Sequence, residues 1–140
     1  MNPEIIFSIA NTTALLSWIW LAVAPRSVWT RRIVWTAIPL LLSAAYLILV
    51  VLFFGGVEGG FGTLADVMKL FDNKHAALAG WIHYLAFDLF VGSWEVRDAQ
   101  EKNISHWFVV PCLFLTFLLG PVGFLAYNAV RLVAAKGERK

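Results

Sequence analysis

The sequence predicts an all-α integral membrane protein built as a four-helix transmembrane bundle, and three observations support this fold class. Of the 140 residues, 60% are apolar and 14% are charged, whereas about 25% are charged in soluble globular proteins. The apolar residues gather in four nearly uncharged runs of about 20 residues, the length that crosses a hydrocarbon core of about 30 Å. These continuous runs lack the alternation of membrane β-barrel strands. We therefore expect a single transmembrane domain over residues 1–140.

The first two helices are expected over residues 5–24 and 33–54. The link between them carries three arginines and no acid, which favours a cytoplasmic position; these are Arg26, Arg31 and Arg32. With four crossings the carboxyl tail would lie on the opposite side, yet it holds four further cations: Arg131, Lys136, Arg139 and Lys140. The charges therefore leave the orientation open, with the early segments favouring both termini outside.

A short amphipathic helix is expected between the second and third spans. Thr63 and Asp66 have the spacing of a helix-capping pair, and apolar residues recur at helical intervals over residues 64–71. Such a helix can lie on the membrane surface. A plain connector without a ligand role is the alternative interpretation.

The third span, residues 76–94, places His83, Tyr84 and Asp88 among apolar residues. An ionisable group at that depth costs several kcal/mol unless it is paired or hydrated, so it should face the interior of the bundle and is a functional-site hypothesis. Periodicity predicts two stripes on this helix, one with Trp81, Tyr84, Asp88 and Glu95, the other with His83, Phe87, Phe90 and Trp94.

The fourth span is expected over residues 107–127 and contains Pro111, Gly120-Pro121 and Gly123. These residues predict a kinked helix that approaches its neighbours closely, with a cleft for a long apolar ligand as the alternative. If the four helices run straight, the rise per residue places His83 near Gly120, and Asp88 at the level of Thr116.

The candidate catalytic residues are Asp88, His83, Glu95 and His106. Asp88 is either a proton-handling acid, because desolvation disfavours a charged carboxyl, or a hydrogen-bonded group that locks the bundle. His83 has the same two interpretations. Glu95 and His106 lie near the loop between the third and fourth spans and would form a metal pair at the interface, without any recognised metal motif. The sequence specifies no cofactor.

Three segments resemble a known family: Asn73-Lys74-His75, GWIHYLAFDLFVGSWEVRDAQ from Gly80 to Gln100, and HWFVVPCLFLTFLLGPVGFLAY from His106 to Tyr127. The chain resembles the neoxanthin-synthase-like family, also called the abscisic-acid-deficient-four family. The resemblance implies a four-span membrane protein related to the conversion of the epoxide violaxanthin to the allenic carotenoid neoxanthin. No transit extension precedes the first span, so we expect a compact bacterial-type member in the cytoplasmic membrane.

The resemblance, together with the ionisable groups in the third span, implies a carotenoid or isoprenoid isomerase that opens an epoxide. Opening the epoxide needs a general acid, and forming the allene needs the loss of a proton. An elongated apolar substrate would lie between helices near Asp88 and His83, lined by Asn11, Trp81, Tyr84 and Phe87. The first alternative is a non-catalytic structural or assembly protein. The second is a metal- or haem-binding protein using His75, His83 or His106.

Membrane lipids are the expected partners, together with a carotenoid or other isoprenoid ligand. The basic residues lie at helix ends, where they anchor helices at lipid headgroups, and nothing indicates a nucleic-acid partner. A homo-oligomer is compatible with helices of this length, but neither small residues nor loop charges specify its number.

Overall fold

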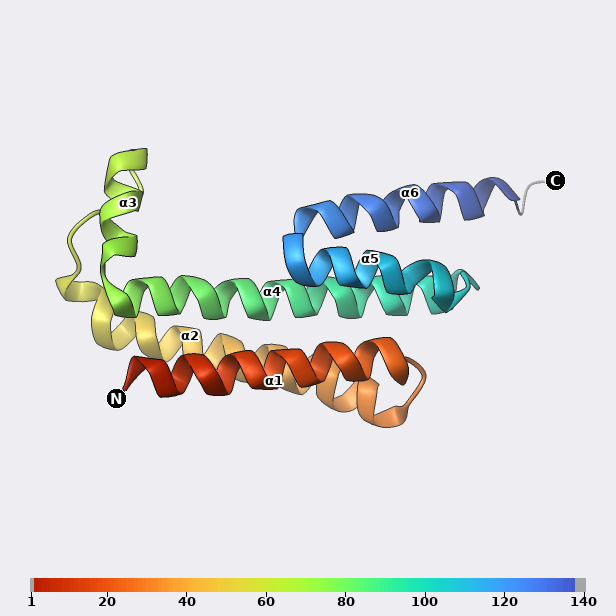
Figure 1. Ribbon diagram of the computed structural model, residues 1–140, viewed down its shortest axis with the longest axis horizontal. Helices are drawn as coiled ribbons and strands as arrows, with labels where there is room; N and C mark the ends of the chain where they lie inside the picture. Colours follow the sequence, from red (N-terminus) through yellow and green to blue (C-terminus); the bar gives the residue numbers. More distant parts are fainter. Residues whose placement is uncertain (1, 138–140) are drawn as a thin grey trace.

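A computed structural model describes residues 2–137, with side chains described as far as residue 134, and this part of the chain holds helices and no strand. Three helical segments are long and apolar enough to cross a membrane. They are α1 (Pro3–Val23), the continuous segment formed by η1 (Thr30–Ala37) and α2 (Ile38–Phe53), and α4 (Lys74–Glu101). Figure 1 shows them side by side, with α4 in contact with both other spans.

The predicted second helix begins three residues earlier than expected and has an unusual start. The segment η1 is π-helical, so its N–H groups bond to the carbonyl five residues back, as Ile38 does with Ile33. Pro39 follows directly and has no N–H to donate to the carbonyl four residues earlier. One α-helical hydrogen bond is therefore missing, and the preceding turns can adopt the π-helical pattern instead. The 3₁₀ turn η2 (Phe54–Gly56) ends the span.

The predicted connecting helix is present as α3 (Leu64–Asp72) at one end of the bundle. Thr63 caps it as expected, because its hydroxyl oxygen accepts the N–H of Asp66. Most of the predicted apolar face is exposed, since Leu64, Met68 and Phe71 are more than half exposed. The buried residue of the helix is Leu70, which lies outside the predicted face. Its position on a membrane surface stays a prediction.

The predicted fourth span is wrong as a single helix. The chain forms α5 (His106–Leu119), reverses at Gly120, and returns as α6 (Pro121–Gly137), so that the two helices make an antiparallel hairpin beside α4 (Figure 1). Gly120 has a φ of +40°, a region that favours glycine, and proline is well suited to the first turn of the new helix. The 14 residues of α5 extend about 21 Å, less than a hydrocarbon core.

The described residues therefore do not form the expected bundle of four long helices: they form three long helices, the short helix α3, and a hairpin that stops part-way along α4 (Figure 1). The amino terminus lies at one end of the bundle, and α6 leads the carboxyl terminus to the other. We call this second end the basic end. The segments at this end carry six described cations: Arg26, Arg31 and Arg32 in the link after α1 and the start of η1, Arg97 and Lys102 at the end of α4, and Arg131, which pairs with Asp98. The opposite end has Lys69 on α3 and Lys74 at the start of α4. The side chains of Lys136, Arg139 and Lys140 lie outside the described residues.

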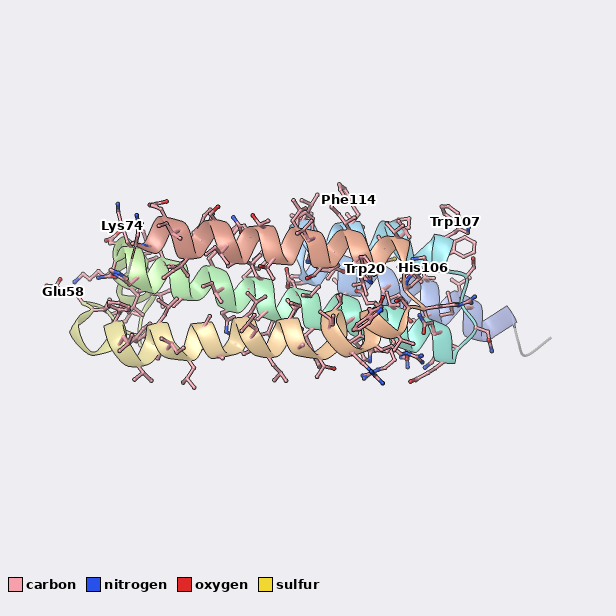
Figure 2. The ribbon with its side chains drawn as sticks, turned by 90° about the horizontal axis from the view of Figure 1, so that it is seen from below. Trp20, Glu58, Lys74, His106, Trp107 and Phe114 are labelled. Carbon is pink, nitrogen blue, oxygen red and sulfur yellow. The ribbon has the colours of Figure 1, made fainter. Side chains whose placement is uncertain are left out.

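Buried residues form two clusters along α4. One lies towards the basic end and includes Trp18, Leu89 and Tyr127, and the other lies towards the amino terminus and includes Leu42 and Ile82. The outer surface is rich in exposed large apolar side chains (Figure 2). An apolar exterior around a packed interior is the arrangement expected of helices that face lipid.

Candidate functional site

One face of α4 carries three carboxyl groups beneath the hairpin. Asp88, Glu95 and Asp98 are separated by seven and three residues, which places them on one side of a helix. Glu95 and Asp98 are buried, and Asp88 is half-buried. We call these three residues the carboxyl face. Each is held differently by the hairpin, and the differences indicate which of them is available for chemistry.

Asp98 is fully partnered, which gives it a structural role. The Tyr127 hydroxyl donates to its Oδ2 at 2.7 Å, and the Arg131 guanidinium pairs with the same oxygen at 2.9 Å. Lys102 Nζ binds Oδ1 from the next turn of α4. Arg131 also lies 5.9 Å from the centre of the Trp94 ring. These contacts tie α6 to the end of α4 and compensate for the burial of a charged group.

We expect Arg131→Gln to lower the free energy of unfolding by about 1–2 kcal/mol, because it leaves the buried Asp98 carboxylate with one cation fewer. The side chain of Arg131 is 37% exposed, which reduces the effect below that of a fully buried pair. Lys102→Gln is the matched control, because its side chain is 38% exposed and pairs with Asp98 within α4, so it ties no second helix to α4. It should cost less than about 1 kcal/mol, as for ion pairs within one helix. Unfolding in detergent measures both. Equal losses would contradict the expectation that the Asp98 contact from α6 stabilises the protein more than the contact within α4.

Glu95 is the most deeply buried of the three carboxyl groups, with no exposed surface. Its Oε1 accepts the hydroxyl of Thr116 on α5 at 2.9 Å. Its Oε2 is buried and has no hydrogen-bond partner among the described residues. A buried polar atom without a partner costs free energy. The hairpin, by covering Glu95, therefore buries its Oε2 at a cost to the stability of the fold.

Asp88 lies at the tip of the hairpin, where the cover ends. A methyl group placed on Gly120 would come within 2.9 and 3.1 Å of the two Asp88 oxygens, so the carboxyl group contacts the turn itself. Its Oδ2 is buried without a hydrogen-bond partner, and no described cation pairs with it. A carboxyl group can donate a proton when neutral and accept one when ionised. Asp88 is therefore the residue of the carboxyl face that has an oxygen without a described hydrogen-bond partner and lies where the hairpin ends, rather than beneath it.

Aromatic side chains lead from the amino-terminal end of the bundle to Asp88. Phe7 of α1 contacts Trp81, and Trp81 contacts Tyr84, with ring centres 5.8 and 5.4 Å apart. Asn11 accepts the Trp81 indole N–H at 2.7 Å, and the Tyr84 hydroxyl donates to the Phe117 carbonyl near the hairpin tip at 3.0 Å. We call Phe7, Trp81 and Tyr84 the aromatic track. A pocket of about 290 Å³ opens at its start, between α1 and α4.

The structure brings some predicted site residues together and separates others. Asn11, Trp81 and Tyr84 form one cluster that leads to Asp88. Phe87 does not join it, because its ring stacks on His83 at 4.7 Å on another side of α4. The predicted levels are also wrong, since Gly120 meets Asp88 rather than His83, and Thr116 meets Glu95.

The histidines lie apart from the carboxyl face. His83 is exposed and packs against Tyr46 and Phe87. His106 bonds to the Ala22 carbonyl at 2.8 Å, so its contact is with α1 and not with Glu95. His75 stacks on Phe53. Within the part of the chain that is described, no group of three or more His, Cys, Asp or Glu residues could hold a metal ion.

Sequence reasoning missed Asp98 as a structural centre and missed its partners. Tyr127 and Arg131 are four residues apart and so share a face of α6, a signal that pointed to a common partner. The partners of Asp98 depend on the course of the chain after Leu119. Thr116 was matched to the wrong carboxyl group for another reason: α4 extends to Glu101, seven residues beyond the predicted end of the third span, which shifts α5 along α4.

Comparison with known proteins supports one family. The family model described as ABA DEFICIENT 4-like matches residues 5–127, which include α2, α4, α5, the hairpin turn and all but the first two residues of α1. No curated protein matches the chain, and neither does any solved structure. Because the matched region covers most of the sequence, the chain belongs to the ABA DEFICIENT 4-like family.

Proposed function

We propose that the protein is an isomerase of a carotenoid or related isoprenoid and that Asp88 is its acid–base group. Membership of the ABA DEFICIENT 4-like family links the chain to carotenoid-related processes. The observation that carries the proposal is the Asp88 carboxyl group, which lies within an apolar helix, has a buried oxygen without a partner and sits at the hairpin tip. Ionisable groups held in such a setting are functional candidates.

An epoxide-to-allene isomerisation needs one group that both gives and takes a proton. Neutral Asp88 would protonate the epoxide oxygen while the carbon–oxygen bond breaks, which leaves a hydroxyl group and a carbocation. The carboxylate would then accept a proton from an adjacent carbon, whose bonding electrons complete the allene. No net proton or electron is gained or lost, so this general acid–base cycle requires no second substrate.

The aromatic track supplies a surface for the rest of the substrate. Its rings are large, apolar and rigid, and they follow α4 from the pocket beside Phe7 to the tip of the hairpin. Glu95 lies seven residues beyond Asp88, about 10 Å along the helix axis, and Thr116 and the hairpin cover it. We assign Glu95 a positioning role, since its bond to Thr116 fixes the hairpin whose turn contacts Asp88.

The test is co-expression with pathways that supply epoxidised carotenoids, followed by chromatography of the pigments. Asp88→Asn keeps the size and some hydrogen bonding but removes the acid, and should lower product formation at least about a hundredfold, within the range for general acid–base groups. His83→Gln is the control, because His83 is exposed and does not contact the carboxyl face. It should leave most of the activity.

Unchanged pigments with the wild-type protein on every epoxidised substrate would contradict the enzymatic proposal. Retained activity in Asp88→Asn would instead remove Asp88 from the mechanism. The second candidate, a non-catalytic assembly protein, is favoured by the Asp98 contacts, which show polar groups holding helices together. In that case Asp88→Asn and His83→Gln should both behave as wild type.

A further inference from the structure

A second pocket lies on the side of α4 that faces η1 and α2. It has a volume of about 400 Å³ and is lined mainly by apolar side chains, among them Pro39, Leu40, Phe87 and Phe90. Trp35 and Arg97 line the same pocket. We call it the η1 groove. Neither the hairpin nor the aromatic track contributes a lining residue, so it is separate from the proposed isomerase site.

Two unpartnered polar groups belong to the η1 groove region, one in the wall of the groove and one behind it. The Trp35 indole N–H is buried and finds no acceptor among the described residues. The same holds for the hydroxyl of Ser93, whose residue is 4% exposed. Ser93 is not one of the lining residues, but it lies between Phe90 and Arg97, at intervals of three and four residues, on the α4 face whose residues line the groove. Two buried donors without acceptors point to a missing hydrogen-bond acceptor.

One residue that lines the groove is an arginine without a described ion-pair partner, and two further arginines lie on the neighbouring η1. Arg97 is exposed and forms no ion pair with another described residue. Arg31 and Arg32 belong to η1, whose helix supplies Trp35, and they likewise pair with no described acid. These arginines lie at the basic end of the bundle, where negatively charged lipid headgroups would attract them.

We infer that the η1 groove binds one molecule of an anionic glycerophospholipid. The phosphate would meet Arg97, and an ester carbonyl would accept from the Trp35 N–H and the Ser93 hydroxyl. Arg97 and Ser93 are one helical turn apart, about 6 Å along the axis, and the glycerol carbons separate phosphate from ester in the same order. The acyl chain would then lie along Phe90 and Phe87, which line the apolar part of the groove.

Native mass spectrometry of the full chain in mild detergent tests the inference. With dioleoyl-phosphatidylglycerol we expect one tightly held lipid per chain, and at least about fivefold lower occupancy with dioleoyl-phosphatidylcholine. The di-ether analogue of phosphatidylglycerol keeps the charge and lacks the ester carbonyls, so it should bind several-fold more weakly than the ester. These comparisons use the wild-type protein and do not depend on how any variant folds.

Variants then assign the contacts. Arg97→Gln should weaken phosphatidylglycerol binding about tenfold, as expected for loss of a charge-assisted hydrogen bond. Arg26→Gln removes an arginine at the same end that does not line the groove and should have little effect. Trp35→Phe and Ser93→Ala should each reduce the preference for ester over ether lipid. The inference is overturned if the wild type binds both headgroups equally, or if Arg26→Gln and Arg97→Gln lose the same affinity.

Discussion

A reporter fused to the carboxyl terminus is expected to lie on the same side of the membrane as the link between α1 and η1. The hairpin enters beside α4 and returns, so α6 leaves the bundle at the basic end (Figure 1). Lys and Arg near helix ends favour the cytoplasm, and the described cations are concentrated at this end. We therefore expect the carboxyl terminus in the cytoplasm and the amino terminus outside.

In a bacterial host, green fluorescent protein fused after residue 140 should fluoresce, and alkaline phosphatase fused there should be inactive. Phosphatase inserted between Gly55 and Gly60 should be active, because this loop lies at the opposite end. Cysteine labelling in a Cys112→Ala background gives an independent check. Ser27→Cys and Ser105→Cys should react from one side, and Glu58→Cys from the other. Active phosphatase at both the carboxyl terminus and the Gly55–Gly60 loop would restore the four-crossing topology, because only an additional crossing puts these two positions on one side.

The conflict between the loop and tail charges had a structural cause. With four crossings, the arginines between α1 and η1 and the cations after residue 130 fall on opposite sides. The reversal at Gly120 brings Arg131 to the same end as Arg26, so that the described charges agree with one orientation. The charge pattern therefore held information about the hairpin that hydropathy did not.

Hydropathy predicted the three long helices because charged or glycine-rich segments bound each of their apolar runs. It could not predict the hairpin, since the run over residues 107–127 is apolar on both sides of Gly120-Pro121. A glycine followed by proline is compatible with a kink and with a reversal. The choice depends on whether α6 can pack against α5, which is a tertiary property.

The candidate site was predicted in part, because helical periodicity groups residues within one helix but does not give their contacts with the hairpin. The helical period grouped Trp81, Tyr84 and Asp88 on one face of α4, and their contacts follow that grouping. It also separated His83 from Asp88. The period could not show which carboxyl group would be paired, because the partners of Asp98 come from α6 and reach it only when the chain reverses.

Gly123→Ala is expected to destabilise the protein more than the other substitutions considered for stability. A Cβ atom at Gly123 would overlap both the backbone nitrogen and the hydroxyl oxygen of Thr116. Backbone atoms cannot move aside as the end of a flexible side chain can, so α5 and α6 would have to separate. We expect a loss of about 3 kcal/mol, at the upper end for overpacking, and a fall in Tm of roughly 10 °C.

The same substitution should also reach the carboxyl face. Thr116 donates to Glu95, so displacing α5 would break that bond and shift the turn that contacts Asp88. Gly56→Ala is the matched control, because nothing lies within 4 Å of the added Cβ, and its Tm should stay within a few degrees of wild type. If Gly123→Ala had the same Tm as Gly56→Ala, α5 and α6 would not be closely packed at Thr116. The hairpin would then lose the contact that favours a reversal over a kink, and the assignment of Asp88 to its tip would fail with it.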